Sequence, residues 1–248
     1  MIKRISFIII ALTVILSAAN AATLSSSALQ KKVEAAEKAL TDFSANMQID
    51  SANKKNISGM GAGYSDVVKL EKAEVKYKKP NLIRIDGYAQ GIKATYIQNG
   101  YSKLVLASMI RQRQNVKNDP GKRQDSLDMG FVNSQLWKDN TITVGQIDSK
   151  GIAKLTLKPK FGGKDKRHDN VWLDTKNLRL IKREKYLASG ELRIKTEFKD
   201  YKNLTSTLPI ATTSSMYDPD GKFLGTASYT NVKVNTGIKS SLFSLETR

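Results

Sequence analysis

From residue 44 onward, short runs of alternating apolar and polar side chains are separated by residues that favour tight turns. Alternation with a period of two is typical of strands that have one apolar face. Asn99-Gly100 is the strongest of the turn signals, because asparagine followed by glycine is preferred in two-residue hairpins. The other turn signals lie at residues 149–151, 174–177, 189–190 and 218–221. The pattern therefore predicts an antiparallel meander of many short strands.

One helix is predicted ahead of the strands, over residues 25–43. Its apolar side chains recur at spacings of three and four residues, which places them on a single stripe. They are Leu29, Val33, Ala36, Leu40 and Phe43. Residues 124–137 are predicted to form a short helical stretch, and residues 115–123 and 162–163 read as loops. The economical arrangement is a helix packed against the apolar face of a curved sheet.

The first 21 residues have the features of a signal peptide. Lys3 and Arg4 precede an uncharged, mostly apolar run over residues 5–16, and Ala19-Asn20-Ala21 fits the small-residue pattern of a signal peptidase site. The run is shorter than the roughly 20 residues that span a bilayer. We therefore expect cleavage near Ala21, export to the periplasm and a single mature domain over residues 22–248. The alternative is a buried or membrane-anchored N-terminal helix.

The composition narrows the classes of function. The 248 residues include 41 Lys and Arg against 23 Asp and Glu. A basic chain raises the question of nucleic acid, but the cations are spread along the sequence and no RNP-like, zinc-finger or P-loop pattern is present. We therefore expect no nucleic-acid partner, and the basic surface is either solvated or attracted to anionic lipid headgroups or an acidic partner. Without cysteine, no disulfide supports the fold, and position 22 lacks the residue on which lipoproteins are acylated.

The sequence offers no convincing catalytic or metal site. Its one histidine, His168, is flanked by Arg167 and Asp169 in a charged segment, whereas a catalytic triad needs a histidine oriented by a buried acid. A zinc site needs three or four converging ligands. Residues 218–221 loosely resemble part of a calcium loop but lack its later carboxylates and final glutamate. We therefore predict no catalytic residue, no metal and no cofactor.

Short motifs follow one another along the chain in a distinctive order. The leader and the amphipathic helix precede a strand, the segment Lys78-Lys79-Pro80-Asn81-Leu82-Ile83-Arg84-Ile85 and the Asn99-Gly100 hairpin. Towards the C-terminus come residues 198–201, 209–210, 218–221 and 234–237, ahead of Leu242-Phe243. In this order the chain resembles the LolA-like family of periplasmic outer-membrane lipoprotein carriers and lipoprotein-sorting proteins, over essentially all of the mature chain.

The resemblance implies a fold that is mainly β with some α. It is a curved antiparallel sheet, an incomplete β-barrel, with an N-terminal helix and short lid helices packed on its concave side. The implied function is that of a carrier, not an enzyme, which holds the acyl chains of lipoproteins or related lipids in an apolar cavity. Its partners would be the acylated cargo, an inner-membrane transporter and an outer-membrane acceptor, and we expect a monomer. The alternatives are a lipid-binding regulator or envelope-stress sensor on the same scaffold, and a secreted hydrolase.

The resemblance also assigns roles to residues. Lys79, followed by Pro80, matches a cation that the family links to the closed lid and to cargo transfer; the alternative is a solvated lysine at a strand end. Ile83 occupies the position of an exposed aromatic residue thought to dock partners; the alternative is core packing. The candidates to line the cavity or its lid, each with ordinary core as the alternative, are Leu29, Val33, Leu40, Tyr101, Phe131 and Trp137.

The chain departs from the family's pattern in two respects. The family often carries arginine where Lys79 stands, and lysine cannot make the same forked contacts to lid carbonyls. The region from Met109 to Trp137 is rich in Arg, Gln and Asn, where the family usually has a more apolar lid. This difference points to a different cargo.

Overall fold

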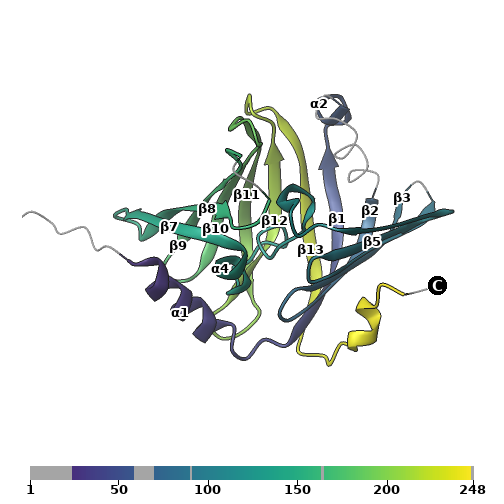
Figure 1. The fold of residues 1–248 in the computed structure, drawn as a ribbon, viewed down its shortest axis with the longest axis horizontal. Helices are drawn as coiled ribbons and strands as arrows, with labels where there is room; N and C mark the ends of the chain where they lie inside the picture. Colours follow the sequence, from purple (N-terminus) through teal and green to yellow (C-terminus); the bar gives the residue numbers. More distant parts are fainter. Residues whose placement is uncertain (1–23, 59–69, 90, 163–164, 247–248) are drawn as a thin grey trace, which may run out of the picture.

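The computed structural model describes residues 24–58, 70–89, 91–162 and 165–246. Its main element is one antiparallel sheet of 13 strands in the order β6-β5-β4-β3-β2-β1-β13-β12-β11-β10-β9-β8-β7. The first and last strands pair in the middle of the sheet, so that β6 and β7 form its two open edges. Two wings diverge from β1 and β13, and α4 lies between them with the segment before it (Figure 1). The predicted open, curved antiparallel sheet with helices is confirmed.

The elements have the following bounds. The strands are β1 Asp42–Ala52, β2 Leu70–Lys78, β3 Leu82–Ala89, β4 Ile92–Asn99, β5 Ser102–Ala107, β6 Ile110–Asn115, β7 Asn140–Ile147, β8 Ile152–Pro159, β9 Asp169–Asp174, β10 Arg179–Tyr186, β11 Leu192–Asn203, β12 Pro209–Tyr217 and β13 Phe223–Val234. The helices are α1 Ser26–Ala36, α2 Lys54–Ser58 and α4 Gln135–Asp139, with 3-10 turns η1 Pro120–Lys122 and η2 Ser240–Phe243.

Helix α1 is shorter than the sequence predicted. It begins after Ser25, whose side chain accepts a hydrogen bond from the backbone N–H of Ala28, but it ends at Ala36 instead of residue 43. The cause is sheet pairing, because Phe43 already lies in β1 opposite Tyr77 and Val234. The apolar spacing continues past the helix since both its stripe and the start of β1 face the same core.

The main core lies between the sheet and the elements that cover its inner face, which we define as the face that packs against α1. Leu29 and Val33 of α1 have no exposed surface and belong to one cluster with Phe43, Tyr77 and Phe131. A smaller cluster of Ile97, Leu104, Ile238 and Phe243 buries the C-terminal segment against β3 and β4. Fully burying one such side chain stabilises the fold by about 1.5–3 kcal/mol.

The turns that the sequence predicted are confirmed, while the second helical stretch is mostly wrong. Asn99-Gly100 joins β4 to β5, and residues 218–221 form the β12–β13 turn and not a calcium loop. Of residues 124–137, helix is found from Gln135 onward. The part before it is irregular because the Asp125 side chain accepts the backbone N–H groups of Leu127 and Asp128, an alternative to helical hydrogen bonds.

Two further predictions meet the limits of the described residues. The signal peptide and its cleavage site near Ala21 lie outside them, as does Gly163 of the predicted loop. The predicted loop at 115–123 does lie within the described residues. Its first residue, Asn115, is the last residue of edge strand β6, Ile110–Asn115. Within the described ranges, no helix has both the length and the hydropathy of a membrane span.

Gly130 provides a test of how closely the irregular segment approaches the sheet. Its φ is +85°, and a Cβ at this position would lie 2.9 Å from the backbone oxygen of Ala211. Gly151 in the β7–β8 turn has a similar φ of +84° but open space around the same position. Gly151→Ala should therefore lower the free energy of unfolding by about 1–2 kcal/mol through backbone strain alone. Gly130→Ala should lower it by about 1–3 kcal/mol more, through overpacking. Urea unfolding measures both, and equal losses would contradict the close approach.

Candidate functional site

An irregular segment with a short helix lies across the inner face of the sheet between β6 and β7. We call residues 124–139 the cover. Phe131 of the cover meets Phe43 and Tyr77 edge-on, with ring centroids 5.5 and 5.3 Å apart. Six of its apolar side chains are at most 8 % exposed, namely Leu127, Met129, Phe131, Val132, Leu136 and Trp137. The cover therefore supplies much of the apolar roof over the sheet.

The cover fills the place where an apolar cavity was expected. The space between the cover and the side chains of Phe198, Ala211 and Tyr229 is about 10 Å³, which is about the room that one water molecule needs. Leu127 and Phe131 have no exposed surface. In this conformation an acyl chain finds no room here, so that binding at this place requires the cover to move.

Both ends of the cover are tied to the same hairpin. At its start, the buried side chain of Gln98 in β4 donates to the backbone oxygen of Gln124 (2.9 Å) and accepts from its N–H (3.0 Å). At its end, the Tyr101 hydroxyl donates to Asp139 at 2.6 Å. Burial and this carboxylate raise the pKa of Tyr101 to about 12. The hairpin of β4 and β5 thus anchors the cover by polar contacts at its two ends.

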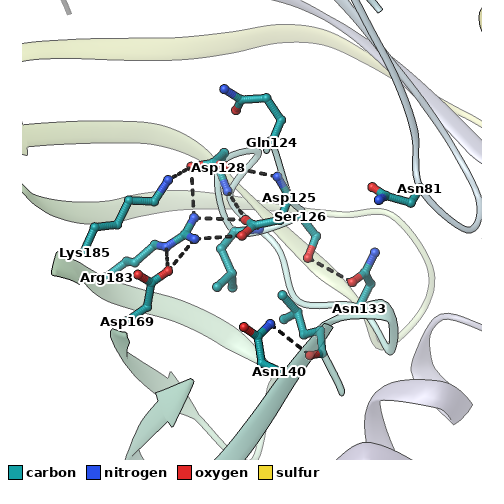
Figure 2. Close-up of polar contacts among 12 residues, drawn as sticks. Asn81, Gln124, Asp125, Ser126, Asp128, Asn133, Asn140, Asp169, Arg183 and Lys185 are labelled. Carbon is teal, nitrogen blue, oxygen red and sulfur yellow. Dashed lines mark hydrogen bonds and ion pairs between the residues drawn. The ribbon is translucent and has the colours of Figure 1, made fainter. Parts of the chain in front are cut away.

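A cluster of charged side chains ties the first part of the cover to the opposite wing (Figure 2). Arg183 of β10 is 4 % exposed and binds both oxygens of Asp125, at 3.0 and 2.7 Å. It also donates to Asp128 at 2.9 Å and to Asp169 of β9 at 2.6 Å. The ammonium group of Lys185 lies 2.6 Å from Asp128. Charge-assisted, bidentate contacts of this kind are the strongest hydrogen bonds that proteins make.

The register of β10 explains why these cations face inward. Pairing between β9 and β10 shifts between Leu180 and Lys182. Beyond this irregularity Arg183 and Lys185 share the inner face, because side chains two residues apart in a strand point the same way. Lys182 lies on the other face, where its ammonium group contacts Glu184 at 2.9 Å and the Trp172 ring at 3.5 Å.

Asp125 and Asp128, the two carboxylates of the cover that contact Arg183, respond differently to this environment. Burial raises the pKa of Asp128, but the charges of Lys185 and Arg183 outweigh it and lower the pKa to about 2. Burial also raises the pKa of Asp125, and there it prevails over the charge of Arg183. Asp128 is therefore the carboxylate that stays ionised over the widest pH range.

Lys79 connects the end of α1 to the cover. Its ammonium group donates to the backbone oxygen of Glu37 at 3.0 Å and lies 3.9 Å from the Glu37 carboxylate. A cation at the C-terminus of a helix is favourable because the last carbonyl groups are unpaired. The Glu37 carboxylate in turn accepts hydrogen bonds from the backbone N–H and the hydroxyl group of Ser134 in the cover. Lys79 is thus hydrogen-bonded to the end of α1 with its side chain 32 % exposed, and its role as a gate stays a prediction.

Pro80, which was predicted with Lys79 as part of the gate, and the predicted cavity residues lie around the contact between Lys79 and Glu37. The Tyr77 hydroxyl donates to the backbone oxygen of Pro80 at 3.0 Å and accepts from Asn133 of the cover at 3.1 Å. The Trp137 ring donates to Ser26 of α1 at 3.0 Å. Leu29, Val33, Leu40, Phe131 and Trp137 all belong to the main core cluster, whereas Tyr101 lies at the end of the cover. Their contact with cargo remains a prediction.

The expected docking role of Ile83 is wrong for this conformation. Ile83 has no exposed surface and packs in the main core cluster. Its position in β3, opposite Tyr77 and Gln98, turns its side chain towards the cover and not towards solvent. A side chain without accessible surface cannot dock a partner, so the alternative of core packing holds.

The charged cluster could not be predicted from the sequence. Residues 182–185 read Lys-Arg-Glu-Lys, and nothing in such a run shows which side chains face inward. Regular alternation along the strand from the inward-facing Leu180 would have placed Lys182 and Glu184 on the inner face of the sheet. The bulge after Leu180 reverses this choice, and it is visible only in the pairing of the strands.

His168, which the sequence singled out, lies apart from the cover. Its ring stacks on Tyr186 with centroids 4.2 Å apart, and its Nδ1 lies 2.9 Å from the backbone oxygen of Lys166. Over the described ranges, no group of three or more His, Cys, Asp or Glu side chains is placed to hold a metal ion.

Comparison with known structures identifies the fold. The similar structures include a LolA superfamily protein from Nitrosomonas europaea, with a TM-score of 0.61 and 15% identity over 90% of this chain and 98% of that one. Another is a putative outer membrane lipoprotein-sorting protein domain from Vibrio parahaemolyticus (TM-score 0.59, 13% identity, 87% and 94% covered). The chain has a LolA-like fold. A DUF1329 family protein from Desulfovibrio piger shares it (TM-score 0.59, 14% identity, 87% and 94% covered). No protein-family model and no curated protein matches the chain.

The contact between Asp128 and Lys185 makes a prediction for stability. Because the pKa of Asp128 falls from its ordinary 3.8 to about 2, its ionised form stabilises the fold at every pH above about 4. This contribution, about 2 kcal/mol at 1.36 kcal/mol per pKa unit, is lost as the pH falls from 4 towards 2. Urea unfolding of the wild type and of Asp128→Asn should therefore differ at pH 6 and converge at pH 2.

Asp220 provides the control for this measurement. Its carboxylate lies 3.0 Å from Lys222, but both side chains are more than 60 % exposed. An exposed pair contributes little, so Asp220→Asn should change the free energy of unfolding by less than about 0.5 kcal/mol at either pH. A constant difference between the wild type and Asp128→Asn across the pH range would contradict the assignment.

Proposed function

We propose that this protein is an exported carrier that takes up the acyl chain of a lipoprotein or related lipid between the sheet and the cover and delivers it to the outer membrane. The observation that carries the proposal is the cover itself. It is a segment whose buried apolar side chains lie on an apolar floor and whose position is set by polar contacts near its start and at its end. The LolA-like fold supports the same reading, because two of the similar structures come from LolA and lipoprotein-sorting proteins.

The energies of the two states are of similar size. Exposing the six buried side chains of the cover costs roughly 10–20 kcal/mol, at about 1.5–3 kcal/mol each. An acyl chain of about 14 methylene groups gains on the order of 10 kcal/mol when it leaves water, at about 0.8 kcal/mol per group. A chain that takes the place of the cover therefore offsets much of the loss. A near balance of this kind favours a carrier, because cargo must be released as well as bound.

The remaining parts of the proposal concern the route. Cleavage near Ala21 would release the mature domain into the periplasm, where an inner-membrane transporter supplies the cargo and an outer-membrane acceptor receives it. The carrier would act as a monomer and would catalyse no covalent reaction.

Direct detection of cargo tests the carrier function. The protein purified from the periplasm is extracted with organic solvent, and the extract is analysed by mass spectrometry. We expect acyl lipid in the extract, and after delipidation we expect uptake of a fluorescent acyl lipid from vesicles. A protein that neither contains nor takes up acyl lipid would overturn the carrier function. A stable complex with a membrane protein would support the lipid-binding sensor instead.

Lys79 tests how the cover is released. Lys79→Met removes the hydrogen bond to Glu37 at the end of α1 and with it a contact that holds the closed state. We expect uptake of the fluorescent lipid to become several-fold faster while the protein stays folded by circular dichroism. Lys38→Met removes the same charge from an exposed position of the adjacent turn and should leave the rate unchanged. Equal rates for Lys79→Met and the wild type would exclude Lys79 as a gate.

A further inference from the structure

The charged cluster divides into a fixed part and a movable part. Arg183, Lys185 and Asp169 belong to strands of the sheet, whereas Asp125 and Asp128 belong to the cover. When the cover leaves, Asp125 and Asp128 leave with it. The sheet then holds two cations against one carboxylate and carries an excess of positive charge at this place.

This charge lies in a poor place for an unpaired cation. Arg183 is 4 % exposed beneath the cover. Removing the partners of a buried cation is strongly unfavourable, because its desolvation is no longer compensated. When an acyl chain takes the place of the cover and keeps water away, an anion where Asp125 and Asp128 were would again compensate this charge.

The cluster stands at one end of an apolar track. On the inner face of β9, Leu173 and Val171 are fully buried and are followed by Asp169. On β10, buried Leu180 is followed by Arg183 and Lys185. Leu173 and Asp169 lie about 13 Å apart along the strand, at about 3.3 Å per residue. An apolar floor that ends in two cations matches an amphiphile with an acyl chain and a negatively charged head.

The charged end of the track also borders solvent. The side chains of Lys185 and Asp125 are each 31 % exposed, whereas Arg183 lies deeper, at 5 %. A headgroup at this position would contact the guanidinium group from inside the site and keep some contact with water. The planar fork of arginine and the ammonium group of lysine both suit the oxygens of a carboxylate or phosphate.

We propose that Arg183 and Lys185 bind the anionic headgroup, a carboxylate or a phosphate, of the lipid whose acyl chain replaces the cover. In the empty carrier Asp125 and Asp128 occupy this site as an internal substitute for the headgroup. The inference rests on the carrier function proposed above and defines its cargo class as anionic amphiphiles. It also gives the acidic residues of the cover a function, since they and the headgroup compete for the same cations.

Two ligands with the same chain test this cargo class. Palmitate and monopalmitoylglycerol share one acyl chain but differ in the charge of the head. Each is titrated against the delipidated protein at pH 7.5, by displacement of the neutral fluorescent probe phenylnaphthylamine. We expect palmitate to bind about tenfold more tightly, which corresponds to 1.4 kcal/mol. Acetate, the same carboxylate without the chain, should not displace the probe, and displacement by acetate at the same concentration would indicate a site for free anions and overturn the proposal.

Substitutions on the two faces of β10 show which lysine is responsible for the preference for palmitate. Lys185→Met should bring the ratio of the two affinities towards one, while Lys185→Arg should keep the preference for palmitate. Lys182→Met is the matched control, because it removes the same charge from the other face of the strand, and it should behave as the wild type does.

Asp128→Asn tests the competition in the opposite direction. It removes the internal partner of Lys185 and should increase the affinity for palmitate several-fold without a similar gain for monopalmitoylglycerol. A purely structural role of the cluster predicts no such gain, so an unchanged or weakened affinity for palmitate would overturn the proposed competition.

The outcomes separate this inference from the function on which it rests. If the wild type binds neither lipid, the carrier function itself fails. If it binds both lipids equally, or if Lys185→Met keeps the full preference for palmitate, the carrier function stands and the anionic cargo class is overturned.

Discussion

The contact of Arg183 with three carboxylates joins parts of the molecule that are far apart in sequence. Asp169 lies on the neighbouring strand, whereas Asp125 and Asp128 come from the cover, more than fifty residues earlier in the chain. One guanidinium group thereby fixes the first part of the cover to β10. The direction of this contact is as important as its strength, because the planar guanidinium group donates to a carboxylate only in certain orientations. Together with the contacts at Gln98, Tyr101 and Glu37, this contact sets the position in which the apolar side chains of the cover pack.

The polar side chains that attach the cover and the apolar side chains that it buries occupy different places. The apolar side chains of the cover supply most of the stabilisation, but apolar contact is non-directional and roughly proportional to area. The polar contacts at Gln98, Tyr101 and Glu37 define where the cover begins, ends and meets α1. A segment held in this way can leave the sheet once a few directional contacts are broken and another apolar surface replaces its own. Because the polar contacts set the position of the cover and the apolar contacts stabilise it, an acyl chain could replace the cover on the sheet.

Much of the fold could be predicted from local patterns. Alternation and turn residues defined the strands, since each depends on neighbours in sequence, and Asn99-Gly100 marked its hairpin correctly. The end of α1 was missed because the spacing of Leu40 and Phe43 suits a helix equally well, and the pairing of Phe43 with Tyr77 and Val234 decided the matter. The site was less accessible still. Lys79 was selected through its likeness to a family position, but the inward direction of Arg183 depends on a bulge that no local pattern shows.

The pairing of β1 with β13 has a consequence for the biogenesis of the protein. These two strands meet in the centre of the sheet although about 170 residues separate them, and long-range pairings of this kind form late because the intervening chain must be ordered first. Until β13 has emerged from the ribosome, β1 lacks one of its two neighbours and the two wings cannot join. A nascent chain that stays unfolded for so long leaves the edges of its early strands unpaired throughout synthesis.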